Sequence, residues 1–137
     1  MTPDLLEWLC AQLDEDERIA RATEWCVGTH TFNGWDVGRA DEYEWEIQSR
    51  NAVIGRGLNE EFARHIVAHD PARVLREIDA KRRITELCEP PLVEVTSPGD
   101  SERSFIPGEG PPWGLNVLKL LALPYADRPG YREEWRP

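Results

Sequence analysis

Apolar residues near the N-terminus recur every three or four positions, which is the spacing of one helix face. The repeating positions are Leu6, Leu9, Leu13 and Ala20, with Ile19 beside them. Thr2 and Pro3 supply a hydroxyl N-cap and a first helical residue that needs no hydrogen-bonding N–H. The pattern therefore predicts a helix over residues 3–25, with Asp14–Arg18 and Glu17–Arg21 ion pairs on its exposed side.

Between Cys26 and Ile54 the period of the pattern changes from helical to strand-like. Glu42 to Gln48 alternates strictly, which predicts a half-buried strand with Tyr43, Trp45 and Ile47 inward and three glutamates in water. Asn33–Gly34 favours a two-residue hairpin turn because both residues tolerate positive φ. Ala52–Ile54 is predicted to form a further strand that Gly55–Gly57 ends. We expect a three- or four-stranded antiparallel meander within residues 27–54, packed against helices.

The middle of the chain predicts a helix, a break and a second helix. Asn59 can cap a helix over residues 60–69, and Asp70 can cap a helix over residues 71–88. Pro71 forces the break, because the residue before a proline is pushed out of helical geometry. The predicted inward residues are Phe62, Ala63, Ile66 and Val67 in the first helix, and Val74, Leu75, Ile78 and Leu87 in the second.

The last third of the chain shows weaker periodicity. Residues 89–112 are rich in Pro, Gly, Ser and Asp, so we expect an irregular segment with a short strand at 92–95 and a turn at 97–100. Residues 113–123 are apolar nearly all round and predict a short buried helix that Pro124 stops. An aromatic tail over residues 124–137 is expected to lie on the body. The predicted fold is a single α+β domain over residues 1–137.

Composition and charge narrow the classes of partner. The chain carries 26 acidic and 16 basic residues, a net charge of −10, which disfavours nucleic-acid binding. Its longest aliphatic run, residues 120–123, is far shorter than a membrane span, and Asp4 and Glu7 stand where a signal peptide is basic. A cytoplasmic location is therefore expected. Cys10, Cys26 and Cys88 are odd in number and far apart, so we expect no disulfides, and no CxxC pair suggests zinc. No bound cofactor is expected.

Two histidines are the candidate metal ligands in this sequence. His65 and His69 lie four residues apart, which is one helical turn and the spacing that lets two imidazoles share an ion. A third ligand would come from Asp70, His30 or Cys88. No glutamate follows His65, so the HExxH pattern of metalloproteases is absent. Ordinary surface histidines near the end of a helix are the favoured interpretation.

Basic and aromatic residues give the remaining candidate binding positions. The basic set could bind phosphate or an acidic partner, but pairing with the chain's own acids is favoured because the whole chain is acidic. The basic residues are Arg73, Arg76, Lys81, Arg82 and Arg83. Trp35 and Trp135 are the candidate exposed anchors for a partner, although burial in the core or docking of the tail is favoured for each. Trp8, Trp45 and Trp113 are predicted to be core residues.

Three stretches resemble a small actinobacterial and actinophage family of unknown function: residues 13–22, 69–77 and 122–127. A looser pattern, ending in Phe62–Ala63 followed by Asp70–Pro71–Ala72, is similar to accessory proteins of the lambdoid phage early region. The resemblance implies a helix, a small antiparallel sheet, a helical pair, self-association and a mobile-element accessory role. Some relatives carry two close cysteines after the basic helix, whereas only Cys88 stands here, so the resemblance does not carry a zinc site over to this chain. The family has no known catalytic residues, so none are carried over.

These observations favour a non-catalytic, acidic protein-interaction module that binds another protein or its own copy through the acidic strand face or the aromatic tail. The alternative is a metal-binding protein or metal-dependent hydrolase that uses His65 and His69. A third hypothesis, a small-ligand module, needs a pocket that no sequence pattern shows. The absence of a catalytic constellation makes an enzyme the less favoured class.

Overall fold

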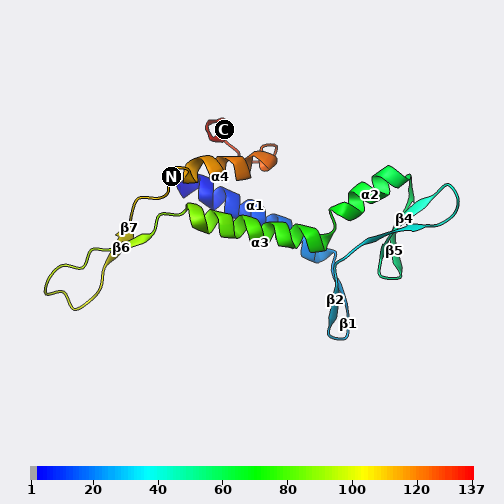
Figure 1. Cartoon of the computed structure of the whole chain (residues 1–137), viewed down its shortest axis with the longest axis horizontal. Helices are drawn as coiled ribbons and strands as arrows, with labels where there is room; N and C mark the ends of the chain where they lie inside the picture. Colours follow the sequence, from blue (N-terminus) through cyan, green and yellow to red (C-terminus); the bar gives the residue numbers. More distant parts are fainter. Residues whose placement is uncertain (1–2) are drawn as a thin grey trace. The chain divides into compact units, whose positions relative to one another are not determined.

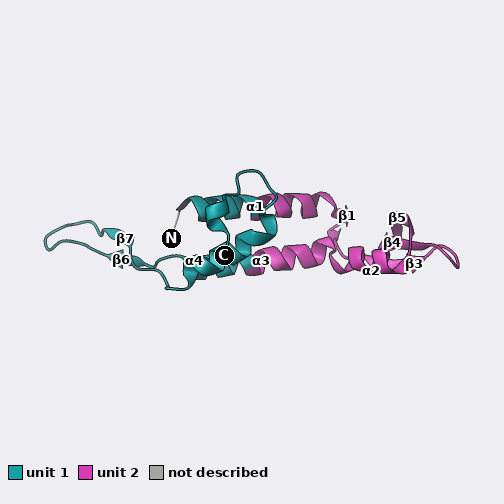
Figure 2. Ribbon diagram, turned by 90° about the horizontal axis from the view of Figure 1, so that it is seen from above, with its two compact units in different colours: residues 1–12, 81–137 teal, residues 13–80 magenta. Residues whose placement is uncertain are grey.

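The structure, a computed structural model, describes residues 3–137, and these divide into two compact units (Figures 1 and 2). Unit 1 comprises residues 1–12 and 81–137, and unit 2 comprises residues 13–80. The predicted α+β class is confirmed, because both units combine helical segments with small antiparallel sheets. The predicted N-cap Thr2 lies outside the described residues.

The helices are α1 (Pro3–Ala22), α2 (Glu60–Ala68), α3 (Pro71–Cys88) and α4 (Gly114–Ala122), with short 3₁₀ helices η1 (Leu123–Tyr125) and η2 (Glu133–Trp135). The strands are β1 (Trp25–Val27), β2 (His30–Phe32), β3 (Asp36–Arg39), β4 (Trp45–Ser49), β5 (Ala52–Leu58), β6 (Leu92–Glu94) and β7 (Phe105–Pro107). β1 pairs with β2, β6 pairs with β7, and β3, β4 and β5 pair in chain order, all antiparallel. No helix within residues 3–137 has the length and apolar character needed to cross a membrane.

The helix break predicted in the middle of the chain is confirmed. Asp70 separates α2 from α3, and its Oδ1 accepts a hydrogen bond from the Arg73 backbone N–H at 2.9 Å. Its Oδ2 accepts a second bond, 3.0 Å long, from the backbone N–H of Trp35. The predicted cap of α2 is also present, since the Asn59 side chain accepts from the Phe62 N–H. Asp70 therefore fixes both the start of α3 and the segment that leads into β3.

The first helix ends at Ala22, three residues before the predicted end at residue 25. Thr23 closes its last turn, donating from Oγ1 to the carbonyl of Ala20 at 2.7 Å. Trp25 instead begins β1, and its indole N–H donates to Ser49 Oγ at 2.8 Å. The tertiary hydrogen bond overrides the helical pattern, which is why the sequence placed this boundary too late.

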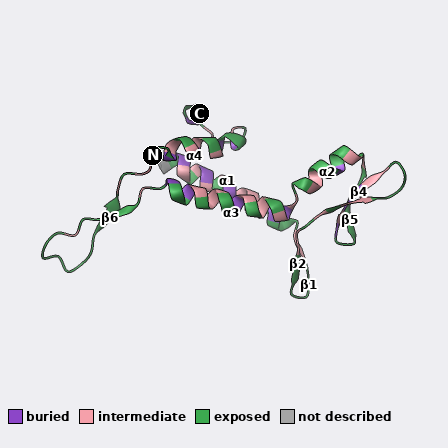
Figure 3. Cartoon of the chain, in the orientation of Figure 1, coloured by how far each residue is buried: buried purple, intermediate pink, exposed green. Residues whose placement is uncertain are grey.

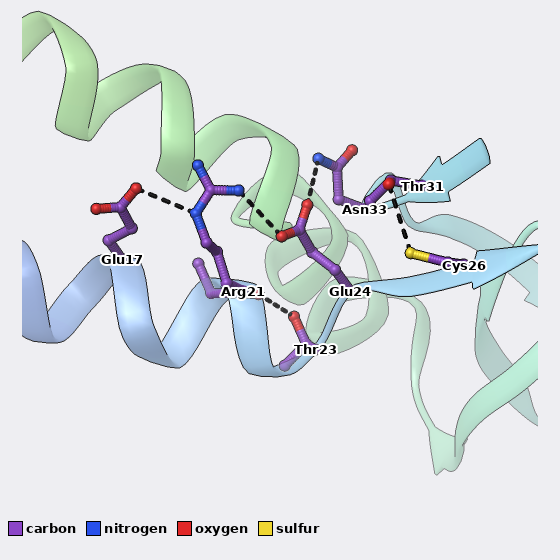
Figure 4. Close-up of polar contacts among 8 residues, drawn as sticks. Glu17, Arg21, Thr23, Glu24, Cys26, Thr31 and Asn33 are labelled. Atoms are coloured by element: carbon purple, nitrogen blue, oxygen red, sulfur yellow. Dashed lines mark hydrogen bonds and ion pairs between the residues drawn. The ribbon is translucent and has the colours of Figure 1, made fainter. Parts of the chain in front are cut away.

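Polar side chains join the end of α1 to the hairpin that follows it (Figure 4). Arg21 pairs with Glu17, as predicted, and also with Glu24, whose second oxygen accepts from Asn33 Nδ2 at 3.1 Å. On the exposed side of the same helix, Arg18 forms its ion pair with Glu15 at 2.6 Å. Two acids of the run over residues 14–17, Glu15 and Glu17, are therefore paired with the helix's own arginines.

The hairpin turn predicted at Asn33–Gly34 was placed wrongly. The turn lies at Gly28–Thr29, where Gly28 has a φ of 61°, a conformation that glycine adopts without steric cost. Asn33 and Gly34 instead connect β2 to β3, which belong to different sheets. The carbonyl of Asn33 accepts from the Ala72 N–H at 3.0 Å, so this dipeptide anchors the connection to the start of α3.

The acidic strand face was also predicted incorrectly. Glu46 is buried, with 6% of its surface exposed, whereas Tyr43 is exposed in the turn before β4. Glu46 accepts from Gln48 Nε2 at 2.7 Å and pairs with Arg56 at 3.5 Å. Gly38, opposite Glu46 on β3, has no side chain, and this leaves room for Glu46 and Gln48. Arg56 reaches Glu46 because β5 continues through residues 55–57, which were predicted to end it.

Several predicted inward positions are exposed instead. The exposed ones are Ile19 on α1, Phe62 on α2, and Leu87 on α3, whereas Ala63 and Ile78 are buried as predicted. Ile66, Val67, Val74 and Leu75 are half-buried. Purple marks the buried positions in Figure 3, and on each helix they alternate with exposed ones. Each helix therefore has a buried face, but that face includes fewer residues than the pattern of apolar positions predicted.

The aromatic tail of unit 1 docks on the first half of α1, as predicted. Trp8 lies 5.6 Å from Tyr131 and 5.4 Å from Trp135 between ring centroids, and its indole N–H donates to the Pro129 carbonyl at 3.0 Å. Trp135 is buried, at 3% exposure. The ring cluster and the buried Leu5, Leu9, Cys88, Leu118 and Ala122 make up the apolar interior of unit 1.

The C-terminal helix is less buried than predicted. α4 buries Leu118 and Ala122 on one side, while Leu120 and the preceding Trp113 are exposed. Pro124 does not stop the chain from coiling, because residues 123–125 continue as the 3₁₀ helix η1. Proline at the start of a new helical segment needs no N–H donor, so it is compatible with this turn.

Candidate interaction surface

The segment that the sequence predicted as irregular contains a β-hairpin. β6 and β7 pair with the register Leu92–Pro107, Val93–Ile106 and Glu94–Phe105. The turn between them includes a bond from the Asp100 N–H to the Ser97 carbonyl at 3.1 Å, and Gly99 has a φ of 95°. In unit 1 the hairpin extends away from the helices (Figure 2). Every residue of both strands is exposed (Figure 3).

Both faces of this hairpin carry exposed apolar side chains. Opposite residues of an antiparallel pair share a face, and successive residues alternate between faces. Val93, Val95 and Ile106 therefore lie on one face, with Ser104 as its polar member opposite Val95. Leu92 and Phe105 belong to the other face, and Leu92 is 70% exposed. Because an isolated two-stranded hairpin is marginally stable in water, an uncovered apolar hairpin is typical of a contact surface.

Backbone hydrogen bonds define which groups of the hairpin point outward. The Gly108 N–H donates to the Pro91 carbonyl at 2.7 Å, and the Val95 N–H donates to the Ser104 carbonyl at 2.8 Å. Bonded and non-bonded pairs alternate along an antiparallel ladder, so the N–H and C=O groups of Leu92 and Glu94 point away from β7. No other strand within residues 3–137 pairs with this outer edge of β6.

The one charged residue on β6 is neutralised within the hairpin. Arg103 donates to both carboxylate oxygens of Glu94, at 2.9 and 2.6 Å, and Thr96 Oγ1 donates to the first of them. Hydrogen bonds from Arg103, and then from Thr96, lower the pKa of Glu94 below its ordinary value. The Arg103 guanidinium also lies 5.5 Å from the centroid of the Phe105 ring. The ion pair thus covers part of the second face.

Glycines hold the base of the hairpin close to the end of α3. A Cβ on Gly114 would lie 3.0 Å from the Cys88 carbonyl, and one on Gly108 would overlap the Val93 side chain. Beside this contact is a cavity of about 520 Å³ lined by Pro90, residues 108–112 and Leu115. Among its lining residues Glu109 alone is charged, so the cavity favours apolar contact rather than acid–base chemistry. Burial raises the pKa of the nearby Cys88 thiol.

His65 and His69 lie together on α2 and at its C-terminal end. Their ring centroids are 4.6 Å apart, both side chains are exposed, and His69 Nδ1 is 2.8 Å from the His65 carbonyl oxygen. Among residues 3–137 no group of three or more His, Cys, Asp or Glu side chains is placed to hold an ion. The proposed third ligand Asp70 is occupied as a helix cap.

Two of the predicted basic residues, Arg73 and Lys81, have separate partners within the chain. Arg73 pairs with Glu77 at 2.8 Å and donates to the Ala68 carbonyl at 3.0 Å. Lys81 donates to the Tyr125 hydroxyl at 3.3 Å, and its Nζ lies 5.4 Å from the centroid of that ring. Arg76 and Arg83 are exposed on α3, and Arg82 is half-buried.

The two candidate tryptophan anchors occupy different environments. Trp35 is half-buried in the connection between β2 and β3, where its backbone N–H is bound by Asp70. Trp135 is buried against Trp8 and Tyr131, so its ring is not available as an exposed anchor. Trp113, predicted to be a core residue, is exposed instead.

Comparison with known proteins shows the family of this chain. The sequence matches the model of DUF6221, a family of unknown function, over residues 2–137. The chain belongs to DUF6221. The predicted resemblance to a family of unknown function across nearly the whole chain is thereby confirmed. No curated protein and no solved structure gives a significant match to this DUF6221 chain.

In this DUF6221 member, the sequence predicted only part of the β6–β7 hairpin. The strand at 92–95 and the turn at 97–100 were predicted, but Phe105–Ile106 was not recognised as the pairing strand. The available signal was a second short apolar run after the Ser-Pro-Gly-Asp turn. Exposure of both runs has no sequence signal, because apolar residues normally indicate burial.

Proposed function

We propose that this DUF6221 chain is a non-catalytic protein-interaction module and that the β6–β7 hairpin is its docking element. The observation that carries the proposal is the exposure of apolar side chains on both faces of a hairpin whose β6 edge has no neighbouring strand within residues 3–137. Exposed strand edges bind extended segments through main-chain hydrogen bonds, and apolar side chains on either face add affinity.

Two other surfaces have less in their favour. Burial and pairing of Glu46 argue against the acidic strand face as a docking surface. Burial of Trp135 inside unit 1 argues against the aromatic tail. A metal-dependent activity has no specific observation in its favour, since His65 and His69 lack a third ligand among the described residues. The hairpin is the candidate that remains.

The phage or mobile-element accessory role is kept as a hypothesis that rests on the sequence resemblance. An interaction module of this size, without a catalytic constellation among its described residues, is compatible with such a role. The gene neighbourhood of DUF6221 members tests it: recurrent phage structural or early-region genes beside them would support the role, and housekeeping operons would contradict it.

A charge-insertion pair tests the docking function. Val93→Lys combined with Ile106→Lys places two cations on the apolar face of the hairpin, at positions 46% and 51% exposed. Val27→Lys combined with Ile54→Lys is the matched control, because both residues are comparably exposed on strands of unit 2 and the net charge changes equally.

We expect the hairpin variant to lose association, with itself or with a captured protein, by at least tenfold relative to the control variant. Light scattering over a concentration series and quantitative capture from lysate measure the two kinds of association. Equal association of both variants, or no association of the wild-type chain in either assay, would contradict the proposal.

A further inference from the structure

We infer that the outer edge of β6 pairs with the same edge of a second copy of this chain, so that two hairpins form one antiparallel sheet. This inference rests on the proposed function, because it specifies the occupant of the docking element. The two-fold axis of this dimer passes between the two copies of Val93, the central residue of β6. Each copy then uses the same residues, as an isologous interface requires.

The outward groups of β6 are self-complementary about this axis. Leu92 and Glu94 flank Val93, and each directs its N–H and C=O away from β7. Antiparallel pairing about Val93 places Leu92 of each copy opposite Glu94 of the other, which gives two equivalent hydrogen-bonded pairs. Every outward donor on the strand therefore meets an acceptor.

Side chains on the face that carries Val93 and Ile106 favour the same pairing. Val93 lies opposite Ile106 within one hairpin, and both are about half exposed. Joining two β6 edges produces a continuous row of Ile106, Val93, Val93 and Ile106 across the combined sheet. The two copies of Val93 form a non-hydrogen-bonded pair, whose Cα atoms lie about 4.5 Å apart.

Local charge permits this contact despite the net charge of −10. Glu94 is the one acid on β6, and Arg103 of the same hairpin already pairs with it in a bidentate arrangement. Antiparallel pairing sends the two turns in opposite directions, so Asp100 and Glu102 of one copy lie far from those of the other. Screening at about 0.15 M salt limits repulsion between the remaining acids to about 8 Å.

The other edge of the hairpin explains why the assembly stops at two copies. Pro107 on β7 occupies a position whose N–H would point outward, and proline has no N–H to donate. Proline on an edge strand is a common protection against further strand addition. With β6 paired and β7 blocked, the sheet does not extend into a filament.

A matched pair of lysine variants tests the position of the axis. Val93→Lys brings two cations face to face across the axis, whereas Ile106→Lys, on the same face, keeps its two cations about 14 Å apart. Sedimentation velocity over a concentration series should show a reversible dimer for the wild-type chain. We expect Val93→Lys to weaken it about 30-fold or more and Ile106→Lys to weaken it less than about threefold.

A charge-complementary mixture provides the decisive result. Val93→Lys and Val93→Glu should each be monomeric alone, and an equimolar mixture should form a heterodimer. A wild-type chain that is monomeric at every concentration, equal effects of the two lysine variants, or no rescue in the mixture would overturn the inference. If the wild-type chain stays monomeric but captures another protein through the hairpin, self-pairing fails while the docking function stands; no hairpin-dependent association of any kind overturns both.

Discussion

Trp135 stabilises unit 1 through ring contacts with Trp8 and Tyr131, at centroid distances of 5.4 and 5.9 Å. Its indole N–H is buried and has no hydrogen-bond partner within the described residues. The ring therefore contributes packing, while its polar group contributes a desolvation penalty. Trp135 acts as a core side chain although it is the third residue from the end of the sequence.

Trp135→Ala should lower the free energy of unfolding by about 3–5 kcal/mol, because a large aromatic ring is removed from a packed site. Trp135→Phe should lower it much less, since it keeps an aromatic ring and removes the indole N–H that has no partner. Urea denaturation followed by circular dichroism measures both. Trp113→Ala, at an exposed position, is the control; a similar loss for that variant would contradict the core assignment of Trp135.

Glu94 makes the stability of the hairpin dependent on pH. Hydrogen bonds from Arg103, and then from Thr96, lower the pKa of Glu94 in the folded chain. A lowered pKa means that ionised Glu94 stabilises the fold above its ordinary value, and that this contribution is lost as the pH falls through the folded value. Both side chains of the pair are largely in contact with solvent, at 70% exposure for Arg103 and 40% for Glu94, so the effect on the whole chain should be small.

Nuclear magnetic resonance detects this local effect where global unfolding does not. The amide shifts of residues 104–105 should change cooperatively as the pH falls below the ordinary glutamate range, about 4.3. Glu94→Gln should abolish this step because the amide side chain does not titrate there. An identical titration in the variant would show that another acid controls the hairpin.

The Asp70 carboxylate accepts one hydrogen bond that caps α3 and a second from the segment that leads into β3. Helix capping by an aspartate is a local property, and the sequence predicted it correctly from Pro71 and the preceding helix. The second bond, from the Trp35 N–H, joins residues 35 positions apart, so the local sequence pattern does not predict it. The same limit explains why the sequence misplaced the end of α1, where Trp25 bonds to Ser49.

Asp70→Ala should therefore cost more than an ordinary helix cap, whose loss is typically about 1 kcal/mol. Asn59→Ala is the matched comparison, because Asn59 caps α2 through one side-chain bond of 3.3 Å. Thermal or urea unfolding of the two variants gives the difference in stability. Equal losses would show that the Asp70–Trp35 bond contributes little to the fold.

Local patterns predicted the existence of most elements, and non-local contacts decided the rest. The α+β class, the helix break and the β3–β4–β5 meander followed from periodicity and capping residues. Burial of Glu46 did not, because it depends on the space beside Gly38 and on Arg56 in the next strand. Of the β6–β7 hairpin, the sequence predicted the first strand and the turn but not β7. A short apolar run does not by itself indicate which strand it pairs with.

At the scale of the molecule, the proposed role of the chain is contact rather than catalysis. The proposal that another strand completes the hairpin rests on its exposed apolar residues, its open β6 edge and the proline on its β7 edge. Four backbone hydrogen bonds, each contributing a net of about 0.5–1.5 kcal/mol, would not by themselves offset the entropy lost on association. Side-chain contact across the axis, chiefly between the two Val93 residues, must supply the remainder, so the expected dimer is weak and depends on concentration.

Hydrogen exchange at single amides tests this account most directly. The N–H groups of Leu92 and Glu94 point outward on the β6 edge, and that of Phe105 points outward on the β7 edge. We predict that exchange at Leu92 and Glu94 slows as the protein concentration rises, while exchange at Phe105 stays fast throughout. Fast exchange at all three amides at every concentration, or protection that appears at Phe105 instead, would contradict it.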